Sequence, residues 1–120
     1  MKYCWTTLHV RSMEESLGFY QDFVGLEVRS RFQPQPLLEI CFLGGGETQV
    51  ELIASGEESV SGKGISLGFV TENLERTLKD AEERGYALLG PPDSPNPRMR
   101  FAFVEDPNGY PIQFVEYRQA

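Results

Sequence analysis

Apolar and polar residues alternate along several short stretches of the chain, which is the pattern of half-buried β-strands. In the first half, this pattern predicts strands over residues 3–10, 26–32, 37–43 and 48–53. Between the first two strands, Ser12 and Glu15 form a capping-box pattern that begins a helix. Gly25 stands where a helix commonly ends. The pattern therefore predicts one strand, one helix and three further strands in the first half.

The second half repeats this order. A strand is predicted over residues 65–71, and Asn73 caps a helix that ends at Gly85. A short strand over 87–89 and a proline-rich loop over 91–97 follow. Strands over 100–105 and 111–117 then flank the turn Asp106-Pro107-Asn108-Gly109, and Asn-Gly is a strong hairpin signal.

The two halves are related by a shift of about 60 residues, a spacing that indicates internal duplication. Ser12 corresponds to Asn73, and Gly25 corresponds to Gly85. The polar segment 54–63 is the candidate linker. We therefore predict an α+β fold of two βαβββ modules, about 1–55 and 64–120, within a single domain 1–120. The alternative to duplication is that the helix caps and glycines of the two halves match in position by chance.

Composition limits the classes of partner. The chain has 120 residues, a net charge of −7 and a pI near 4.7. Such an acidic surface repels nucleic acids and anionic membranes, so we expect neither as a partner. No apolar stretch of about 18 residues is present, and the N-terminus lacks a signal-peptide core, so we expect a cytoplasmic protein. Cys4 and Cys41 fit no zinc or redox spacing and are expected to be buried apolar residues rather than a disulfide.

Two stretches of the sequence resemble motifs of a known family. The stretch from Leu8 to Tyr20, LHVRSMEESLGFY, followed by Gly25-Leu26, resembles the opening motif of the vicinal oxygen chelate superfamily. The stretch from Glu105 to Phe114, EDPNGYPIQF, resembles its closing motif. Together they span nearly the whole chain. This superfamily contains glyoxalases, dioxygenases, epimerases, fosfomycin-modifying enzymes and metal-free antibiotic-binding proteins, so the resemblance does not by itself fix a function.

The resemblance implies a half-open barrel with a concave ligand face, and metal ligands on the first and last strands of each module. By their distance from the motifs, the four ligand positions fall on Trp5, Glu51, Ser66 and Gln113. An indole N–H cannot ligate a metal, and a neutral serine hydroxyl is a poor ligand. His9 is the only histidine, so a two-histidine site within one chain is impossible. We expect no cofactor; a weak divalent-metal site of Glu51, Gln113, His9 and water remains the disfavoured alternative.

Strand alternation places Trp5, Thr7 and His9 on one face and Leu8 and Val10 on the other, under the helix. His9 is either a ligand-facing acid–base group, since imidazole titrates near neutral pH, or a structural histidine at the mouth of the sheet. The same alternation predicts an aromatic pocket with a few polar groups. Its expected ligand-binding residues are Trp5, Thr7, His9, Ile40, Phe42, Glu51, Ser66, Phe101, Phe103, Gln113 and Tyr117. The alternative is that this face is plain core against the other half or another subunit.

The proline-rich segment 93–98 is either a lid, with Arg98 or Arg100 meeting an anionic ligand, or an ordinary surface loop. Exposed sheet edges favour association, and the resemblance implies a homodimer. Three functions follow. The first is a binder of a small, partly aromatic molecule without a metal. The second is a lyase or isomerase similar to lactoylglutathione lyase, with Glu51 as general base and His9 or Gln113 polarising an oxygen. The third is a structural dimer with a vestigial pocket.

Overall fold

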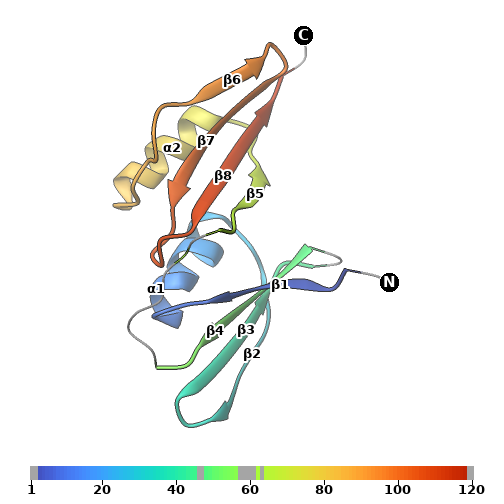
Figure 1. Cartoon of the computed structure of the whole chain (residues 1–120), viewed down its shortest axis with the longest axis vertical. Coiled ribbons are helices and arrows are strands. Elements are labelled where there is room, and N and C mark those ends of the chain that lie inside the picture. The colour runs from blue at the N-terminus through green and yellow to red at the C-terminus, as the bar shows by residue number, and fades with distance from the viewer. Residues whose placement is uncertain (1–2, 46–47, 57–61, 63, 119–120) are drawn as a thin grey trace. The chain divides into compact units, whose positions relative to one another are not determined.

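The structure is a computed structural model, and it describes residues 3–45, 48–56, 62 and 64–118. The chain divides into two compact units, Met1–Val60 and Ser61–Ala120. Each unit holds its own four-stranded sheet, as Figure 1 shows. The boundary between the units falls within the polar segment predicted as a linker. That both units act as a single domain stays a prediction.

The first unit contains β1 (Trp5–His9), α1 (Met13–Leu17), the π-helix η1 (Gly18–Phe23), β2 (Val28–Gln35), β3 (Leu38–Leu43) and β4 (Gln49–Ala54). Its strand order is β1-β4-β3-β2. The pair β1–β4 is parallel, whereas the other two pairs are antiparallel. The strand order places β4 between the first strand and the hairpin of β2 and β3.

The second unit contains β5 (Leu67–Val70), α2 (Leu74–Glu83), β6 (Asp93–Asn96), β7 (Met99–Glu105) and β8 (Pro111–Tyr117). Its strand order, β5-β8-β7-β6, and its strand directions repeat those of the first unit. In Figure 1, α2 lies against β7 and β8. The predicted α+β fold of two βαβββ modules is confirmed, and each sheet is open rather than closed.

Both predicted helix caps are present. The Ser12 Oγ accepts a hydrogen bond of 3.2 Å from the Glu15 N–H, and the Asn73 Oδ1 accepts one of 3.0 Å from the Arg76 N–H. The continuous α-helix expected between Ser12 and Gly25 is wrong, because its second part is the π-helix η1. The wider turn lets Phe19, Tyr20 and Phe23 form edge-to-face ring pairs, with Phe19 and Tyr20 fully buried.

The buried face of each sheet carries the alternate apolar residues. In the first sheet Leu8 and Val10 are buried, as predicted, and α1 contacts β4. The buried residues of the sheets and their helices include Cys41, Leu43, Val50 and Leu52 in the first unit and Leu74, Ala81, Ala102, Val104, Ile112 and Phe114 in the second. Burying a Leu- or Ile-sized side chain stabilises the fold by about 1.5–3 kcal/mol. The opposite face of each sheet is left for other contacts.

An ion-pair network ties α1 to the first sheet. Arg31 on β2 donates to Glu39 on β3 and, at 2.5 Å, to Glu14 on α1. The hydrogen bonds that Arg31 donates, to Glu39 first and then to Glu14, raise the pKa of Arg31 above its ordinary value. The guanidinium thus contacts α1 and β3 at the same time, at a partly exposed surface.

Two expectations about the rest of the chain need correction. The short strand expected at 87–89 in the second module is only an isolated bridge between Leu88 and Val104. The strand β6 lies inside the segment expected to be a loop. Pro95 is tolerated there because β6 is the edge of its sheet. The segment is therefore neither a free lid nor an ordinary surface loop.

The two cysteines differ. Both are free; Cys41 is buried as expected, but Cys4 is exposed because it precedes the first strand. Burial raises the pKa of the Cys41 thiol; the charge of Arg31 lowers it by a smaller amount, and the charge of Glu39 adds to the rise. None of the helices that the structure describes is long and apolar enough to span a membrane.

Candidate functional site

The centre of the candidate site in the first unit is a carboxylate on β4. Glu51 lies opposite Thr7 on β1 and opposite Phe42 on β3. The Thr7 hydroxyl donates a hydrogen bond of 2.5 Å to the Glu51 Oε1. Both side chains are half-buried. The carboxylate is thus held in one orientation, with its second oxygen available for another donor.

Aromatic rings flank this carboxylate. The Trp5 and Phe42 rings meet edge to face, with centroids 5.0 Å apart and an angle of 79° between planes. Trp5 is 42% exposed, which is unusual for so large an apolar side chain. The first sheet therefore brings together Trp5, Thr7, Phe42 and Glu51, all predicted site residues, with Ile40 two positions along β3 from Phe42.

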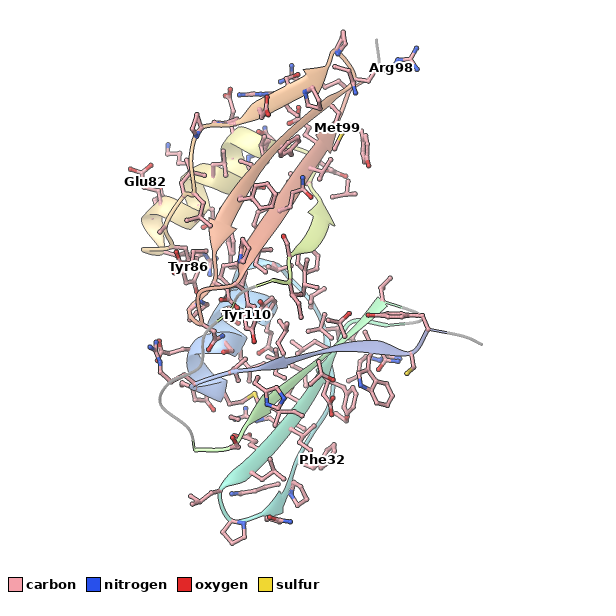
Figure 2. The ribbon with its side chains drawn as sticks, in the orientation of Figure 1. Phe32, Glu82, Tyr86, Arg98, Met99 and Tyr110 are labelled. Carbon is pink, nitrogen blue, oxygen red and sulfur yellow. The ribbon has the colours of Figure 1, made fainter. Side chains whose placement is uncertain are left out.

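Phe32 was missed by the sequence analysis. It lies opposite Ile40 across the β2–β3 pair and is 46% exposed, and Figure 2 shows its position near the end of that hairpin. Strand alternation alone could not have found it, because β2 and β3 are offset by irregular register shifts. We call the surface of Trp5, Thr7, His9, Phe32, Ile40, Phe42 and Glu51 the first site face.

His9 lies at the end of β1, exposed, and its register partner is Ile53 rather than Glu51. Alternation keeps it on the same face as Trp5 and Thr7, as predicted. Its backbone position is two residues along the strand from Thr7. His9 therefore lies at the border of the first site face, and its role as an acid–base group stays a prediction.

The second unit has an equivalent arrangement around Gln113. This residue lies between Gly68 on β5 and Phe103 on β7, just as Glu51 lies between Thr7 and Phe42. The Gln113 Oε1 would be 3.7 Å from a Cβ at Gly68. The Phe101 and Phe103 rings meet edge to face with centroids 5.9 Å apart. We call the surface of Gly68, Met99, Phe101, Phe103, Gln113, Val115 and Tyr117 the second site face.

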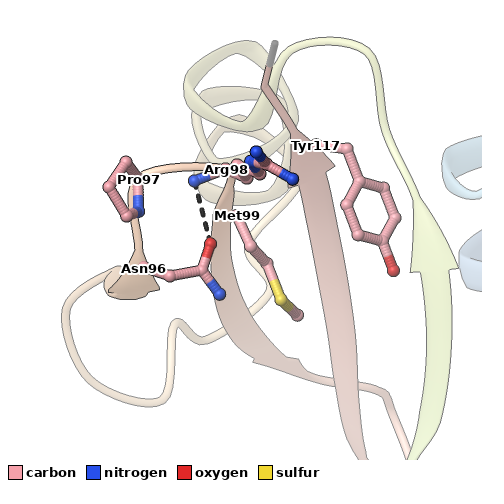
Figure 3. A pocket seen from close by; sticks show the side chains of 5 residues that line it. All are labelled: Asn96, Pro97, Arg98, Met99 and Tyr117. Atoms are coloured by element: carbon pink, nitrogen blue, oxygen red, sulfur yellow. Dashed lines mark hydrogen bonds between the residues drawn. The ribbon is translucent and has the colours of Figure 1, made fainter. Parts of the chain in front are cut away.

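Ser66 and Tyr117 lie away from the centre of that face. Ser66 precedes β5, and its hydroxyl donates a hydrogen bond of 2.6 Å to the Pro111 carbonyl. Tyr117 is the last residue of β8 and is 65% exposed. It borders a hollow at the β6–β7 turn, shown in Figure 3. Ser66 is therefore engaged with the backbone, whereas Tyr117 presents its ring to solvent.

The closing sequence motif is a structural turn. The Asp106 Oδ1 accepts the backbone N–H groups of Asn108 and Tyr110 at 2.9 and 2.8 Å. Asp106 and Asn108 are both buried. Gly109 supplies the positive φ, 89°, that this turn needs. The motif thus sets the β7–β8 hairpin and, through it, the position of Gln113.

The donor set does not fit the metal centre that the resemblance implies. Of the four positions, Trp5 offers no lone pair, and Ser66, whose hydroxyl donates its proton to the Pro111 carbonyl, is a neutral hydroxyl and therefore a poor ligand. Glu51 offers a carboxylate and Gln113 a weak amide oxygen. Among residues 3–45, 48–56, 62 and 64–118, no group of three or more His, Cys, Asp or Glu side chains could hold a metal ion.

The comparisons with known proteins agree with the fold. A family model described as Glyoxalase/Bleomycin resistance protein/Dioxygenase superfamily matches residues 3–114. The uncharacterized protein YwbC of Bacillus subtilis is 27% identical, covering 92% of this chain and 94% of its own length. The lactoylglutathione lyase of Neisseria meningitidis is 26% identical, covering 97% and 91%.

A solved structure extends the likeness. TnmS3, an antibiotic binding protein from Streptomyces, superposes with a TM-score of 0.70 at 23% identity, covering 98% of this chain and 96% of its own. At that identity the likeness concerns the fold alone. With the family match over nearly the whole sequence, the chain belongs to the glyoxalase/bleomycin resistance protein/dioxygenase superfamily.

Proposed function

We propose that the protein binds a small, partly aromatic molecule without a bound metal. The observation that carries the proposal is the Trp5–Phe42 ring pair beside the Glu51 carboxylate that Thr7 orients. A site of this kind combines an apolar platform with a few polar groups that fix orientation. The first site face provides both.

The rings would supply most of the affinity. A planar ligand that covers the exposed part of Trp5 removes apolar surface from water, and a ring pair adds about 0.5–1.5 kcal/mol beyond that burial. The aromatic side chains of the first site face therefore favour a ligand with a flat ring.

Glu51 would supply orientation. Its second carboxylate oxygen can accept a hydrogen bond from a ligand N–H or O–H, and a hydrogen bond to a charged group contributes about 1.5–3 kcal/mol. Gln113, in the equivalent place of the second unit, can both donate and accept. The chemistry is recognition through polar contacts and rings, with no step that requires a metal.

The test uses Trp5 as its own reporter, since it is the only tryptophan in the chain. A panel of planar aromatic compounds is titrated while the indole emission is recorded. We expect at least one compound to quench or shift the emission saturably, and Phe42→Ala to weaken its binding by about tenfold. Leu37→Ala, at the exposed β2–β3 turn, is the matched control. A panel without any saturable change contradicts the proposal.

The metal-free part has a separate test. The purified protein is assayed for bound metal, and Ni, Zn, Mn and Fe are titrated into the wild type and Glu51→Ala. We expect no stoichiometric metal and no binding that depends on Glu51. Tight binding of about one metal per chain, lost in Glu51→Ala, would contradict the metal-free proposal and favour an enzyme.

A second candidate function is a lyase that uses Glu51 as general base. It is favoured by the half-buried, oriented carboxylate and by the relatives named lactoylglutathione lyase. Here Glu51 would remove a proton next to a carbonyl, with His9 or Gln113 polarising the oxygen. Lactoylglutathione turnover is assayed in the wild type, Glu51→Gln and the exposed control Glu27→Gln. Turnover lost only in Glu51→Gln supports this function, and equal turnover in all three eliminates it.

The third alternative, a structural dimer with a vestigial pocket, differs in its assembly rather than its chemistry. The outer strands β1 and β2 leave edges of the first sheet unpaired within that sheet, which favours association with a second copy. We propose a cytoplasmic homodimer, and sedimentation equilibrium tests the oligomeric state. A dimer that responds to no compound in the fluorescence panel would favour the structural role.

A further inference from the structure

A hollow lies at the end of the second sheet, at the β6–β7 turn. It has a volume of about 550 Å³ and is lined by Asn96, Pro97, Arg98, Met99 and Tyr117. Met99 and Tyr117 are register partners on β7 and β8. Figure 3 shows the Met99 side chain between the turn and the Tyr117 ring. The hollow therefore continues the second site face beyond the Phe101–Phe103 pair.

The turn that bears Arg98 is fixed by local chemistry. Asn96 and Met99 are register partners, so Pro97 and Arg98 form the two-residue connection. Pro97 restricts its own φ, and the Asn96 Oδ1 accepts the Arg98 N–H at 2.8 Å, as Figure 3 shows. The Ser94 hydroxyl donates to the Asn96 and Met99 carbonyls. The Arg98 side chain thus starts from a well-defined backbone.

The charge of Arg98 is not used within the described part of the chain. Arg100 pairs with Glu75, and Arg118 pairs with Glu116, but Arg98 belongs to none of the ion pairs among the described residues. The sequence left open whether Arg98 or Arg100 would meet an anionic ligand, and the ion pair between Arg100 and Glu75 favours Arg98. In a chain of net charge −7, Arg98 thus places a positive charge at a hollow that it lines together with the Met99 thioether and the exposed Tyr117 ring.

We infer that the hollow of the second unit is a binding site in its own right, for a small molecule that carries a carboxylate next to an aromatic ring, and that Arg98 binds this carboxylate. This site goes beyond the proposed function, which concerns the first site face. The Arg98 guanidinium matches a carboxylate with two parallel hydrogen bonds. The ring of the ligand lies against Tyr117 and the Met99 thioether, which contacts aromatic rings favourably. Pro97 adds an apolar ring to the lining of the hollow.

The probes are 2-naphthoate and its neutral counterpart 2-naphthamide, which share a ring and differ in charge. Binding is followed in full-length protein labelled with ¹³C at the methionine methyl groups. Met99 reports on the hollow, and the buried Met13 reports on non-specific change. We expect the naphthoate to bind about tenfold more tightly than the amide, because a charged hydrogen bond is roughly twice as strong as a neutral one.

Variants assign that preference to one residue. Arg98→Gln is expected to bind both probes equally, whereas Arg118→Gln, a neighbouring arginine already paired with Glu116, keeps the preference. Tyr117→Leu is expected to weaken both probes. A preference that survives in Arg98→Gln, or equal binding by the wild type, overturns the inference and leaves the proposed function standing. No binding of either probe, with an unresponsive Trp5 panel, overturns both.

Discussion

The Thr7 hydroxyl donates its hydrogen bond to Glu51 across the parallel β1–β4 pair, at the centre of the first site face. This contact joins two residues far apart in sequence and sets the direction of the one carboxylate on that face. Its equivalent in the second unit is the Gly68–Gln113 pair, where the partner side chain is missing. The two modules therefore share a backbone frame and differ in chemistry at its centre.

Thr7→Val is expected to reduce the free energy of unfolding by about 1–2 kcal/mol, because a half-buried carboxylate loses its donor. Thr6→Val is the control, since Thr6 contacts Tyr3 at the exposed surface, and it should cost less than about 0.5 kcal/mol. Urea denaturation measures both. In the double variant with Glu51→Gln the losses should be less than additive; strict additivity would show that Thr7 acts independently of Glu51.

Asp106→Ala is expected to destabilise the protein by about 2–3 kcal/mol, because two buried backbone N–H groups lose their acceptor. Asp106→Asn retains an acceptor oxygen and should cost less. Asp93→Ala, whose carboxylate accepts an exposed backbone N–H of Ser94, is the control. Thermal unfolding ranks the three variants. Equal effects of Asp106→Ala and Asp93→Ala would contradict a structural role for the closing motif.

Gly62→Ala tests a close approach in the second unit. A Cβ there would lie 2.5 Å from the Tyr110 nitrogen and 2.6 Å from its Cδ1. Since backbone cannot move aside cheaply, we expect a loss of about 2 kcal/mol or more. Gly45→Ala is the matched control, because nothing lies within 4 Å of its added Cβ. If both variants melt at the same temperature, the Gly62–Tyr110 packing is wrong.

The hydrogen bonds that Glu116 accepts predict that the stability of the protein depends on pH. Its Oε1 accepts the N–H of Leu74 at 2.8 Å, at the first turn of α2, and Arg118 donates to Oε2 at 3.0 Å. These contacts, the Leu74 N–H first, lower the pKa of Glu116 below its ordinary 4.5. A lowered pKa means that the stabilisation is complete above pH 4.5 and is lost as the pH falls through the folded-state pKa.

Glu116→Gln should therefore be less stable than the wild type at pH 7, and the difference should shrink on acidification. Urea midpoints between pH 7 and pH 3 measure it. Glu83→Gln, at the last position of α2, serves as the control for a general charge effect. A difference that stays constant or grows as the pH falls would contradict the assigned contacts.

Much of the fold follows from local pattern. Ser12 and Asn73 cap their helices because their side chains reach backbone N–H groups three residues away, a contact that needs no distant partner. The alternation that buries Leu8 also places Trp5 and Thr7 on the opposite face. The bounds of the last strand, Pro111–Tyr117, match the prediction because a proline and a turn precede it.

Other features depended on contacts between distant segments. The sequence could name Glu51 as a carboxylate on a strand, but its orientation by Thr7 needed the β1–β4 register. The exposure of Phe32, the place of β6 at a sheet edge and the π-helix at Phe19 all arise from packing, which overrides local preference. Arg98 and Arg100 looked equivalent until the structure paired Arg100 with Glu75.

The amino-acid sequence alone therefore determined the repeated βαβββ order, the helix caps and which residue types stand at the four positions where the resemblance implies metal ligands, since each rests on local periodicity or on side-chain chemistry. The tertiary structure alone decided which side chains meet: Thr7 with Glu51, Trp5 with Phe42, and Tyr117 with Met99 beside Arg98. The physical reason is that strand register and strand order are set by the burial of whole faces, and no short stretch of sequence contains that information.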